Sequence, residues 1–323
     1  MNTMLPDTGT VKAVRIHSFG GPEALCLEYV APPKPAANEV LVRVHAAGVN
    51  PCDWKMREGM FGPMSMPQTL GGDFAGVVEA LGSGVTDFFV GQPVFGHSDN
   101  GGAFAELVVV PVSHLAPKAA SVEDVEAAAT PLCALTAWQA LFEVADLQSN
   151  QKILIHGAAG GVGMFAVQLA LRRGAWVIAT ASSRNLPFLC RLGANQLIDH
   201  NAVRFEDAVK SVDVVLDLIG GETQDRSWKV LKHDGRLVST VSTPSPEKAM
   251  LCGVRACKMQ TQIRADDLTL MGDLIANGEL KVAVEKILPL RRAAEALELS
   301  RRGHVRGKIV LTIDHEACHA GSF

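Results

Sequence analysis

The sequence predicts an α/β protein of two domains, an antiparallel barrel-like domain and a doubly wound parallel sheet. Three observations predict this class. The chain has 323 residues, which exceeds the ~100–200 residues of one typical domain core. Short apolar runs separated by Gly, Pro and Asn fill residues 11–117, and no long amphipathic helix interrupts them. From Lys152 onward, strand-like runs alternate with helical segments, which favours a parallel sheet with right-handed crossovers.

The first part of the chain is typical of a β-rich domain. Strands are expected at residues 11–16, 40–46, 75–81, 93–95 and 105–110. A short helix is expected at residues 51–59. Ser121 precedes Val-Glu-Asp-Val and fits the capping box at the start of a helix, and a further helix is expected over residues 135–145.

The second part of the chain alternates between the two element types. Strands are expected at residues 152–156, 175–180, 196–199, 212–217 and 235–241. A last helix at 290–302 and a strand at 308–313 are typical of a return to the first domain. We therefore expect one domain over residues 1–125 and 286–323, and the other over residues 126–285.

Composition and charge exclude several classes of protein. Hydrophobic residues make up 48% of the chain and charged residues 20%, as in ordinary globular proteins. A net charge of −4 without any basic run argues against nucleic-acid binding. No apolar stretch reaches the ~18 residues of a membrane span, and residues 1–7 lack the pattern of a signal peptide. The seven cysteines form no CxxC pair, so we expect reduced thiols in a cytoplasmic protein.

The strongest motif is the glycine-rich turn Ile-His-Gly-Ala-Ala-Gly-Gly-Val-Gly at residues 155–163. A strand precedes it, a mostly apolar helix follows it, and the next strand completes a βαβ unit. A helix N-terminus presents unpaired N–H groups and the positive end of the helix dipole, so a pyrophosphate can bind there. We expect cofactor contacts at Gly160, Gly161, Val162 and Gly163. The alternative is an ordinary tight turn, against which the strand–turn–helix–strand context argues.

Five sequence landmarks occur along the chain. They are Ala-Gly-Val-Asn-Pro-Cys-Asp-Trp-Lys at 47–55, Gly-Gly-Asp-Phe-Ala-Gly-Val-Val at 71–78, Leu-Thr-Ala-Trp at 135–138, the glycine turn at 157–163, and Gly-His-Val-Arg-Gly-Lys-Ile-Val-Leu at 303–311. With them, the chain resembles the zinc-free quinone oxidoreductase branch of the medium-chain dehydrogenase/reductase superfamily. The resemblance implies a GroES-like β-barrel catalytic domain, a Rossmann cofactor domain, a homodimer and a small-molecule electrophilic acceptor.

The resemblance also bears on metal binding. Zinc-dependent relatives hold a catalytic zinc with Cys, His and Cys, because Zn²⁺ prefers sulfur and nitrogen ligands. The resemblance places Asn50, Gly72 and Leu132 at these positions, and none of the three is a strong zinc ligand. Cys52 and Cys133 are an alternative pair, but they are off register and no histidine accompanies them. We therefore expect a site without metal.

The residues after the second strand of the βαβ unit indicate which cofactor binds. An NAD site normally has an Asp or Glu there, about 20 residues beyond the glycine turn, to bind the ribose. This chain instead carries Ser182, Ser183 and Arg184, which suit a 2′-phosphate and favour NADPH over NADH. The alternative is that Ser182 caps the next helix and Arg184 is a solvated surface residue.

Further cofactor contacts are implied by the resemblance alone. His200 follows Ile-Asp at a position where relatives often carry a tyrosine that helps to bind the phosphate. Its imidazole either donates a hydrogen bond to the phosphate or belongs to an exposed loop, and the sequence leaves both open. The remaining contacts implied by position are Leu218, Ile219, Val241 and Lys308.

The expected reaction is reduction of an electron-poor acceptor. Without a metal, nothing stabilises an alkoxide at neutral pH, so hydride transfer from NADPH to a quinone or an α,β-unsaturated carbonyl is favoured. The resemblance implies that Asn50 donates through its amide and that Thr136 contacts the nicotinamide. Lys55 is a candidate donor to the substrate oxygen, or else a solvated lysine, and Arg57 is open to the same two interpretations. Asp53 is more suited to anchoring its loop than to transferring protons.

Two other functions remain open at this point. One is a cofactor-binding protein without catalysis, since some members of the family have structural or regulatory roles. The other is an enoyl-thioester reductase, which uses the same hydride chemistry. The sequence does not identify the acceptor. Its binding site is expected near residues 50–65 and 240–265, and the apolar run 250–259 suits either that site or a subunit interface.

Overall fold

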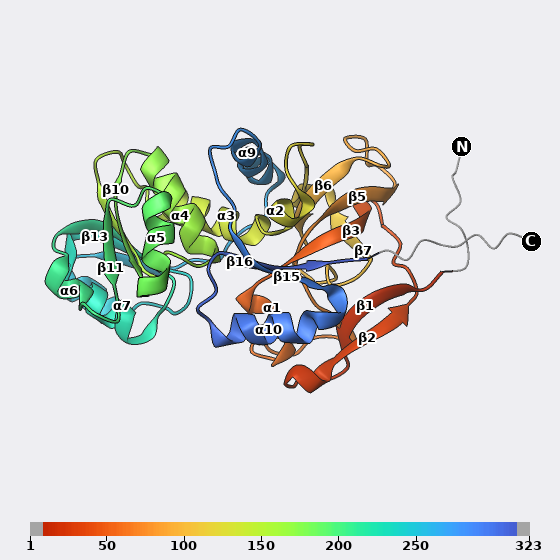
Figure 1. The fold of residues 1–323 in the computed structure, drawn as a ribbon, viewed down its shortest axis with the longest axis horizontal. Coiled ribbons are helices and arrows are strands. Elements are labelled where there is room, and N and C mark those ends of the chain that lie inside the picture. The colour runs from red at the N-terminus through yellow and green to blue at the C-terminus, as the bar shows by residue number, and fades with distance from the viewer. Residues whose placement is uncertain (1–8, 315–323) are drawn as a thin grey trace, which may run out of the picture.

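The computed structural model describes residues 9–314. Figure 1 shows two lobes side by side, one holding the N-terminal strands together with the last helix and strand, the other holding the middle of the chain. Residues 1–7, to which the signal-peptide prediction applies, lie outside the described residues. Within the described part, no helix is long and apolar enough to cross a membrane.

The first lobe is built around a seven-stranded sheet that is mostly antiparallel. Its strands run in the order β15-β16-β3-β5-β6-β8, and β7 pairs with β3. Their bounds are β3 Glu39–Val49, β5 Asp73–Leu81, β6 Pro93–His97, β7 Leu107–Pro111, β8 Leu115–Pro117, β15 Val284–Pro289 and β16 Lys308–Thr312. A smaller sheet has the order β2-β1-β4, with β1 Val11–Ile16, β2 Leu25–Val30 and β4 Gln68–Thr69.

Helices close the ends of this lobe. They are α1 Pro51–Arg57, α2 Asp124–Ala128 and α10 Ala293–Arg302. Arg57 ties α1 to α10, because its fully buried guanidinium donates to Glu298 Oε1 at 2.8 Å and to Glu58 Oε1 at 3.0 Å. Arg57 is therefore not the solvated surface residue that the sequence allowed, and its guanidinium links the two helices.

The second lobe contains a six-stranded parallel sheet with helices around it (Figure 1). The strand order is β11-β10-β9-β12-β13-β14, with β9 Lys152–Ile155, β10 Trp176–Ala181, β11 Gln196–Asp199, β12 Val212–Asp217, β13 Leu231–Ser239 and β14 Arg255–Lys258. The helices of this lobe are α3 Pro131–Trp138, α4 Gly161–Arg172, α5 Leu186–Arg191, α6 Phe205–Ala208, α7 Gly221–Ser227 and α8 Pro246–Cys252. Helix α9 Ala265–Ala276 contacts α3 and also β8 of the first lobe (Figure 1). The strand order reverses between β9 and β12, and ligands of such sheets bind at the carboxyl ends beside that reversal.

Burial explains why the central strand β9 consists mainly of apolar residues. Ile153, Leu154 and Ile155 of β9 are all completely buried, so both faces of the strand are covered. Phe165 and Val167 of α4 are also fully buried in the same core. The helix after the glycine turn is thus held rigidly against the sheet.

Several expectations differ from the structure. The prediction of a capping box at Ser121 is wrong: α2 begins at Asp124 after the N-cap Glu123, because a turn from Ala119 to Val122 comes first. The helix expected at 135–145 begins earlier, as α3, and continues as a wider π-helical segment, η3 Gln139–Val144. No separate element was expected at β2, β4, β8, α8, α9 or β15, and β14 lies in the run 250–259, which was expected at the acceptor site or an interface. The expected domain boundary between residues 285 and 286 stays a prediction; β15, which pairs with β16, spans these residues.

Candidate active site

The glycine turn connects β9 to α4 through backbone that side chains would obstruct. Gly157 has φ +67°, the left-handed region that favours glycine. A Cβ on Gly163 would lie 2.6 Å from Ala158 Cα, so the helix can pack this closely only without a side chain. A Cβ on Gly160 would meet Gly157 O alone, at 3.4 Å, so its outer side is open. Among the described residues, no side chain caps α4 at Gly160, so the N–H groups of its first turn that the Gly307 bridge does not engage can bind an anion.

The first lobe reaches this turn through the segment before β16. Gly307 N–H donates to Ala159 O at 2.8 Å, and Gly307 and Gly160 form a parallel bridge. A Cβ on Gly161 would lie 2.8 Å from Cys133 Sγ and 3.0 Å from Lys308 Cδ. The phosphate-binding end of α4 therefore lies directly against side chains from α3 and β16.

A buried polar cluster, which we call the Asn50 cluster, lies at this junction. It consists of Asn50, Asp73, His97, Cys133 and Lys308, all nearly inaccessible to solvent. Asn50 Nδ2 donates to Asp73 Oδ2 at 2.7 Å, and Lys308 Nζ donates to Asn50 Oδ1. Lys308 Nζ also donates to Val49 O at 2.9 Å and lies 3.5 Å from Asp73 Oδ2. The antiparallel pairing of β16 with β3, in which Ile309 faces Val49, produces this contact.

Asp73 is the centre of the Asn50 cluster. Its Oδ1 is 2.7 Å from His97 Nδ1 and accepts from Leu132 N–H at 3.0 Å. Burial alone would raise the pKa of Asp73, but the His97 hydrogen bond and the Lys308 charge outweigh it and lower the pKa. Burial likewise disfavours the charged form of His97, yet Asp73 outweighs burial and raises the pKa of the imidazole. Asp73 is therefore an ionised carboxylate stabilised by the Lys308 ammonium and by the His97 hydrogen bond.

The charge state of Lys308 follows from the same balance. Burial lowers the pKa of a lysine, but neighbouring Cys133, Asp73 and Asp53 act in the opposite direction and the pKa of Lys308 is raised. The ammonium is therefore charged at neutral pH although only 3% of the residue is exposed. Lys308 was expected to contact the cofactor. Its stem does lie beside Gly161, while its charged end points to Asn50 and Asp73.

Asp53 holds the backbone of the loop after β3. Its Oδ2 accepts from Asn50 N–H at 2.7 Å, which forms a capping box at the start of α1. Burial raises the pKa of this carboxyl to about 7, against the hydrogen bond and the Lys308 charge. The anchoring role expected from the sequence agrees with this geometry.

The other expected catalytic residues have different surroundings. Thr136 on α3 is buried, and its hydroxyl contacts Leu132 O and Thr261 Oγ1, each at 2.6 Å. Lys55 on α1 is half-buried, and its ammonium lies over the Trp54 ring, 5.5 Å from the centroid. Thr136 therefore adjoins the Asn50 cluster through Leu132, whereas Lys55 packs on its neighbouring tryptophan.

The residues expected to select the cofactor lie at the carboxyl ends of β10 and β11. Ser182 is the N-cap of a short helix over Ser183–Asn185, although its side chain makes no capping hydrogen bond within the described residues. Arg184 is more than half exposed and contacts His304 O and, at 3.9 Å, Glu285. His200 is exposed, and its backbone N–H donates to Ala181 O at 3.1 Å. These side chains thus share one edge of the sheet with the glycine turn.

The loop after β12 closes the other side of the turn. Asp217 Oδ1 accepts from the N–H groups of Ile219 and Gly220 at 3.0 and 2.8 Å, which fixes the loop over residues 217–220. A Cβ on Gly157 would lie 3.0 Å from Ile219 Cδ1, so Ile219 lies against the glycine turn. Leu218 also lies near this turn, because a Cβ on Gly157 would be 3.5 Å from Leu218 Cβ. Val241 is exposed beyond β13. Of the positions implied by resemblance around this loop, Leu218 and Ile219 adjoin the glycine turn and Val241 adjoins Gly220.

The donor set of the site does not suit zinc. A His in place of Gly72 would collide with His97, since a Cβ there would lie 2.9 Å from both ring nitrogens. Burial raises the pKa of the Cys52 and Cys133 thiols, which disfavours the thiolate that binds metal. Within residues 9–314, no group of three or more His, Cys, Asp and Glu side chains is arranged to hold a metal ion.

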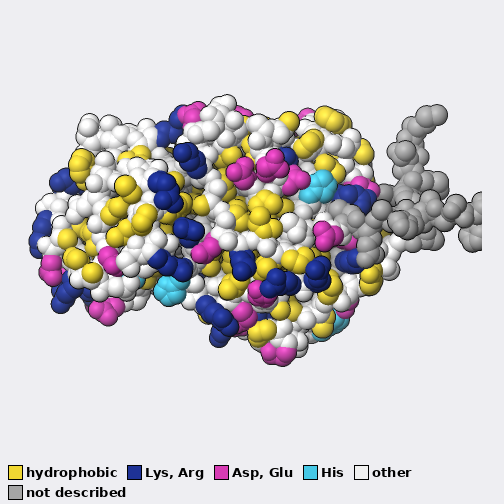
Figure 2. All heavy atoms as spheres, in the orientation of Figure 1, with side chains coloured by type: hydrophobic (Ala, Val, Ile, Leu, Met, Phe, Trp, Pro, Cys, Tyr) yellow, Lys and Arg dark blue, Asp and Glu magenta, His cyan; other side chains and the backbone are white. Residues whose placement is uncertain are grey.

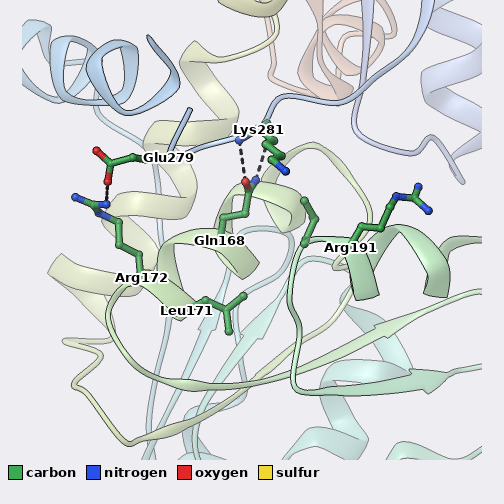
Figure 3. A pocket seen from close by; sticks show the side chains of 7 residues that line it. Gln168, Leu171, Arg172, Arg191, Glu279 and Lys281 are labelled. Carbon is green, nitrogen blue, oxygen red and sulfur yellow. Dashed lines mark hydrogen bonds and ion pairs between the residues drawn. The ribbon is translucent and has the colours of Figure 1, made fainter. Parts of the chain in front are cut away.

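A separate groove of about 360 Å³ lies at the C-terminal end of α4 (Figure 3). Gln168 bonds there to the backbone of Lys281, and Arg172 pairs with Glu279. The glycine turn is at the opposite end of the same helix, so this groove is not part of the candidate site. On the face drawn in Figure 2, basic and acidic side chains are interspersed, without a continuous basic surface.

Comparisons with known proteins agree with this architecture. The family model described as "Alcohol dehydrogenase GroES-like domain" matches residues 36–120, and the one described as "Zinc-binding dehydrogenase" matches residues 192–311. The chain is 30% identical to the quinone oxidoreductase of Mus musculus, over 94% of this chain and 98% of that protein. The solved quinone oxidoreductase from Coxiella burnetii is 34% identical with a TM-score of 0.89, covering 94% of this chain and 100% of that one. The Escherichia coli quinone oxidoreductase complexed with NADPH is 30% identical with a TM-score of 0.86, covering 93% and 99%.

Proposed function

Because the chain belongs to the quinone oxidoreductase-like branch of the medium-chain dehydrogenase/reductase superfamily, with a GroES-like domain and a Rossmann-like parallel sheet, we propose a specific activity for it. The chain is an NADPH-dependent, zinc-independent oxidoreductase that transfers hydride to a quinone or an α,β-unsaturated carbonyl. One observation carries the proposal: an anion-binding glycine turn lies directly against a buried amide, ammonium and carboxylate, where zinc-dependent relatives hold a metal.

The residues around the turn fit a dinucleotide phosphate. The open outer side of Gly160 and the free N–H groups of α4 would hold the pyrophosphate. Ser183 and Arg184, both exposed at the end of β10, would bind a 2′-phosphate, and β10 is followed by no carboxylate that would bind the ribose of NAD. When bound, the reduced nicotinamide supplies the hydride.

The chain's own side chains would orient the acceptor and stabilise its oxygen. Asn50 donates one amide hydrogen to Asp73, and its second amide hydrogen has no acceptor among residues 9–314. That hydrogen is suited to bond the oxygen on which negative charge develops as hydride reaches the acceptor. Thr136 on α3 would contact the nicotinamide, and Lys55 on α1 would be a further donor to the substrate oxygen.

A substrate panel tests the proposal. The metal-depleted protein is mixed with NADPH and, in turn, with quinones, 2-alkenals and enoyl thioesters, and the absorbance of NADPH is followed, with NADH as control. We expect turnover with quinones or alkenals that is faster with NADPH than with NADH. Tight NADPH binding without turnover of any acceptor would instead indicate a non-catalytic cofactor-binding protein. Turnover of thioesters alone would indicate an enoyl-thioester reductase.

A further inference from the structure

Lys308 holds a position that the proposed reaction does not yet use. Its ammonium is buried and charged, and it contacts Val49 O, Asn50 Oδ1 and Asp73 Oδ2 as well as the Cys133 thiol. No other lysine or arginine within the described part of the chain contacts the side chain of Asn50 or Asp73. Lys308 is therefore the one fixed positive charge against this amide.

The contacts of Asn50 fix the direction of its amide. Oδ1 accepts from the Lys308 ammonium and faces the Cys133 thiol at 3.5 Å, while Nδ2 donates to the Asp73 carboxylate. A flipped amide would place its NH₂ against an ammonium and its oxygen against a carboxylate, so the charges permit only one orientation. A cation on the oxygen of an amide draws electron density from its nitrogen and makes the remaining N–H a stronger donor.

We propose that Lys308 is a positioning residue that acts through Asn50, polarising its amide so that the free N–H stabilises the acceptor oxygen during hydride transfer. The inference rests on the proposed function and deepens it. In an enone, the hydride would leave C4 of NADPH, which is oxidised to NADP⁺, and form a C–H bond at the β-carbon; the conjugated π electrons shift towards the carbonyl, which leaves an enolate oxygen. A proton from water then completes the saturated product, so Asn50 and Lys308 keep their own protons. The Lys308 charge thus does part of what a metal does as a Lewis acid in zinc-dependent relatives.

The variants must respect the charge balance of the Asn50 cluster. Removing Lys308 alone leaves the Asp73 carboxylate buried with less compensation, which destabilises the fold as well as the site. The double variant Lys308→Met/Asp73→Asn removes both charges and keeps similar side-chain volumes. Lys281→Met, on the separate groove, is the matched control for loss of a lysine. The measurements are kcat, KM for the acceptor, NADPH affinity by fluorescence titration and thermal unfolding.

We expect the double variant to lose about 10²-fold in kcat, the usual effect of weakening one oxyanion donor. KM, NADPH affinity and the melting temperature should stay close to the wild type, as should every property of Lys281→Met. Alkylammonium ions should restore kcat of Lys308→Ala in a saturable way, and neutral alcohols of the same size should not.

Three results would overturn the inference. One is an unchanged kcat in the folded double variant. Another is a loss of activity that a loss of NADPH affinity explains entirely, since Lys308 would then be a cofactor contact only. The third is equal rescue by amines and alcohols, which would indicate a filled cavity rather than a charge. If the wild type itself binds NADPH but reduces no acceptor, the proposed function fails and this inference fails with it.

Discussion

Two alanine substitutions in the glycine turn should affect different properties, because the two glycines have different surroundings: one should lower stability and the other NADPH affinity. At Gly163, a methyl group would lie 2.6 Å from Ala158 Cα, whereas ordinary carbon contacts need about 3.5–4.0 Å. To relieve this contact, α4 must move about 1 Å away from the turn. The atoms that the methyl group meets belong to the backbone, so they cannot rotate away as a side chain could. Overpacking costs about 1–3 kcal/mol, and the rigid surroundings indicate the upper end of that range for Gly163→Ala.

Gly160→Ala is the contrasting substitution. Its backbone angles, φ −79° and ψ −177°, suit alanine, and the added methyl would meet a single atom at an ordinary distance. The change in stability should stay within about 1 kcal/mol. The methyl would, however, occupy the space through which a pyrophosphate approaches α4, so NADPH affinity should fall about 10–100-fold, or about 1.4–2.8 kcal/mol.

Thermal unfolding and NADPH titration by fluorescence separate the two effects. At about 2–4 °C for each kcal/mol in a domain of this size, Gly163→Ala should melt about 6–12 °C below the wild type. Gly160→Ala should melt within about 4 °C of the wild type and bind NADPH weakly. A Gly163→Ala protein as stable as the wild type, or a Gly160→Ala protein with undiminished affinity, would refute the assigned geometry of the turn.

Three further predictions concern single side chains. Burial raises the pKa of Asp53 from its ordinary 3.8 to about 7, so the free energy of unfolding falls as pH rises between these values, by up to about 4 kcal/mol. In urea unfolding, Asp53→Asn should lose this dependence, and parallel wild-type and variant curves would contradict it. Burial lowers the pKa of His156 to about 4, so its contribution to the free energy of unfolding, about 3 kcal/mol, is lost as pH falls from 6.5 to about 4. His156→Gln should reduce the dependence of stability on pH in this range, and an unchanged dependence would exclude His156 as its cause. Arg184→Ala should weaken NADPH binding about 10-fold or more and leave NADH binding unchanged; equal effects on both cofactors would argue against 2′-phosphate recognition.

Local sequence patterns were sufficient to predict the parallel sheet. The four strands from β9 to β12 are apolar runs bounded by glycine and polar residues, and all four lie within about two residues of their expected bounds. The missed helix α9 also carried a signal, since its buried Leu268, Met271 and Leu274 recur at helical spacing. The missed strands β2 and β4 carried less, because most residues of β2 are exposed or half-buried and β4 has only two residues.

The Asn50 cluster could not be predicted from local patterns. Lys308 and Asn50 are 258 positions apart, and Asn50 and Asp73 are 23 apart, so only the pairing of β16 with β3 and of β3 with β5 joins them. The sequence did hold one hint: Lys308 begins the apolar strand Lys-Ile-Val-Leu, and a lysine that is buried must have a charged partner. His97 gave no comparable signal, because its contact with Asp73 depends on the packing of its ring against Gly72.

The most direct test is transfer of deuterium to an enone from NADPH that carries deuterium at both C4 positions, catalysed by protein that has been stripped of metal. The account predicts slower oxidation of the labelled cofactor, one deuterium on the β-carbon of the product by mass spectrometry, and no change in rate when zinc is added. An unlabelled product, or activity that disappears with chelation and returns with zinc, would contradict it.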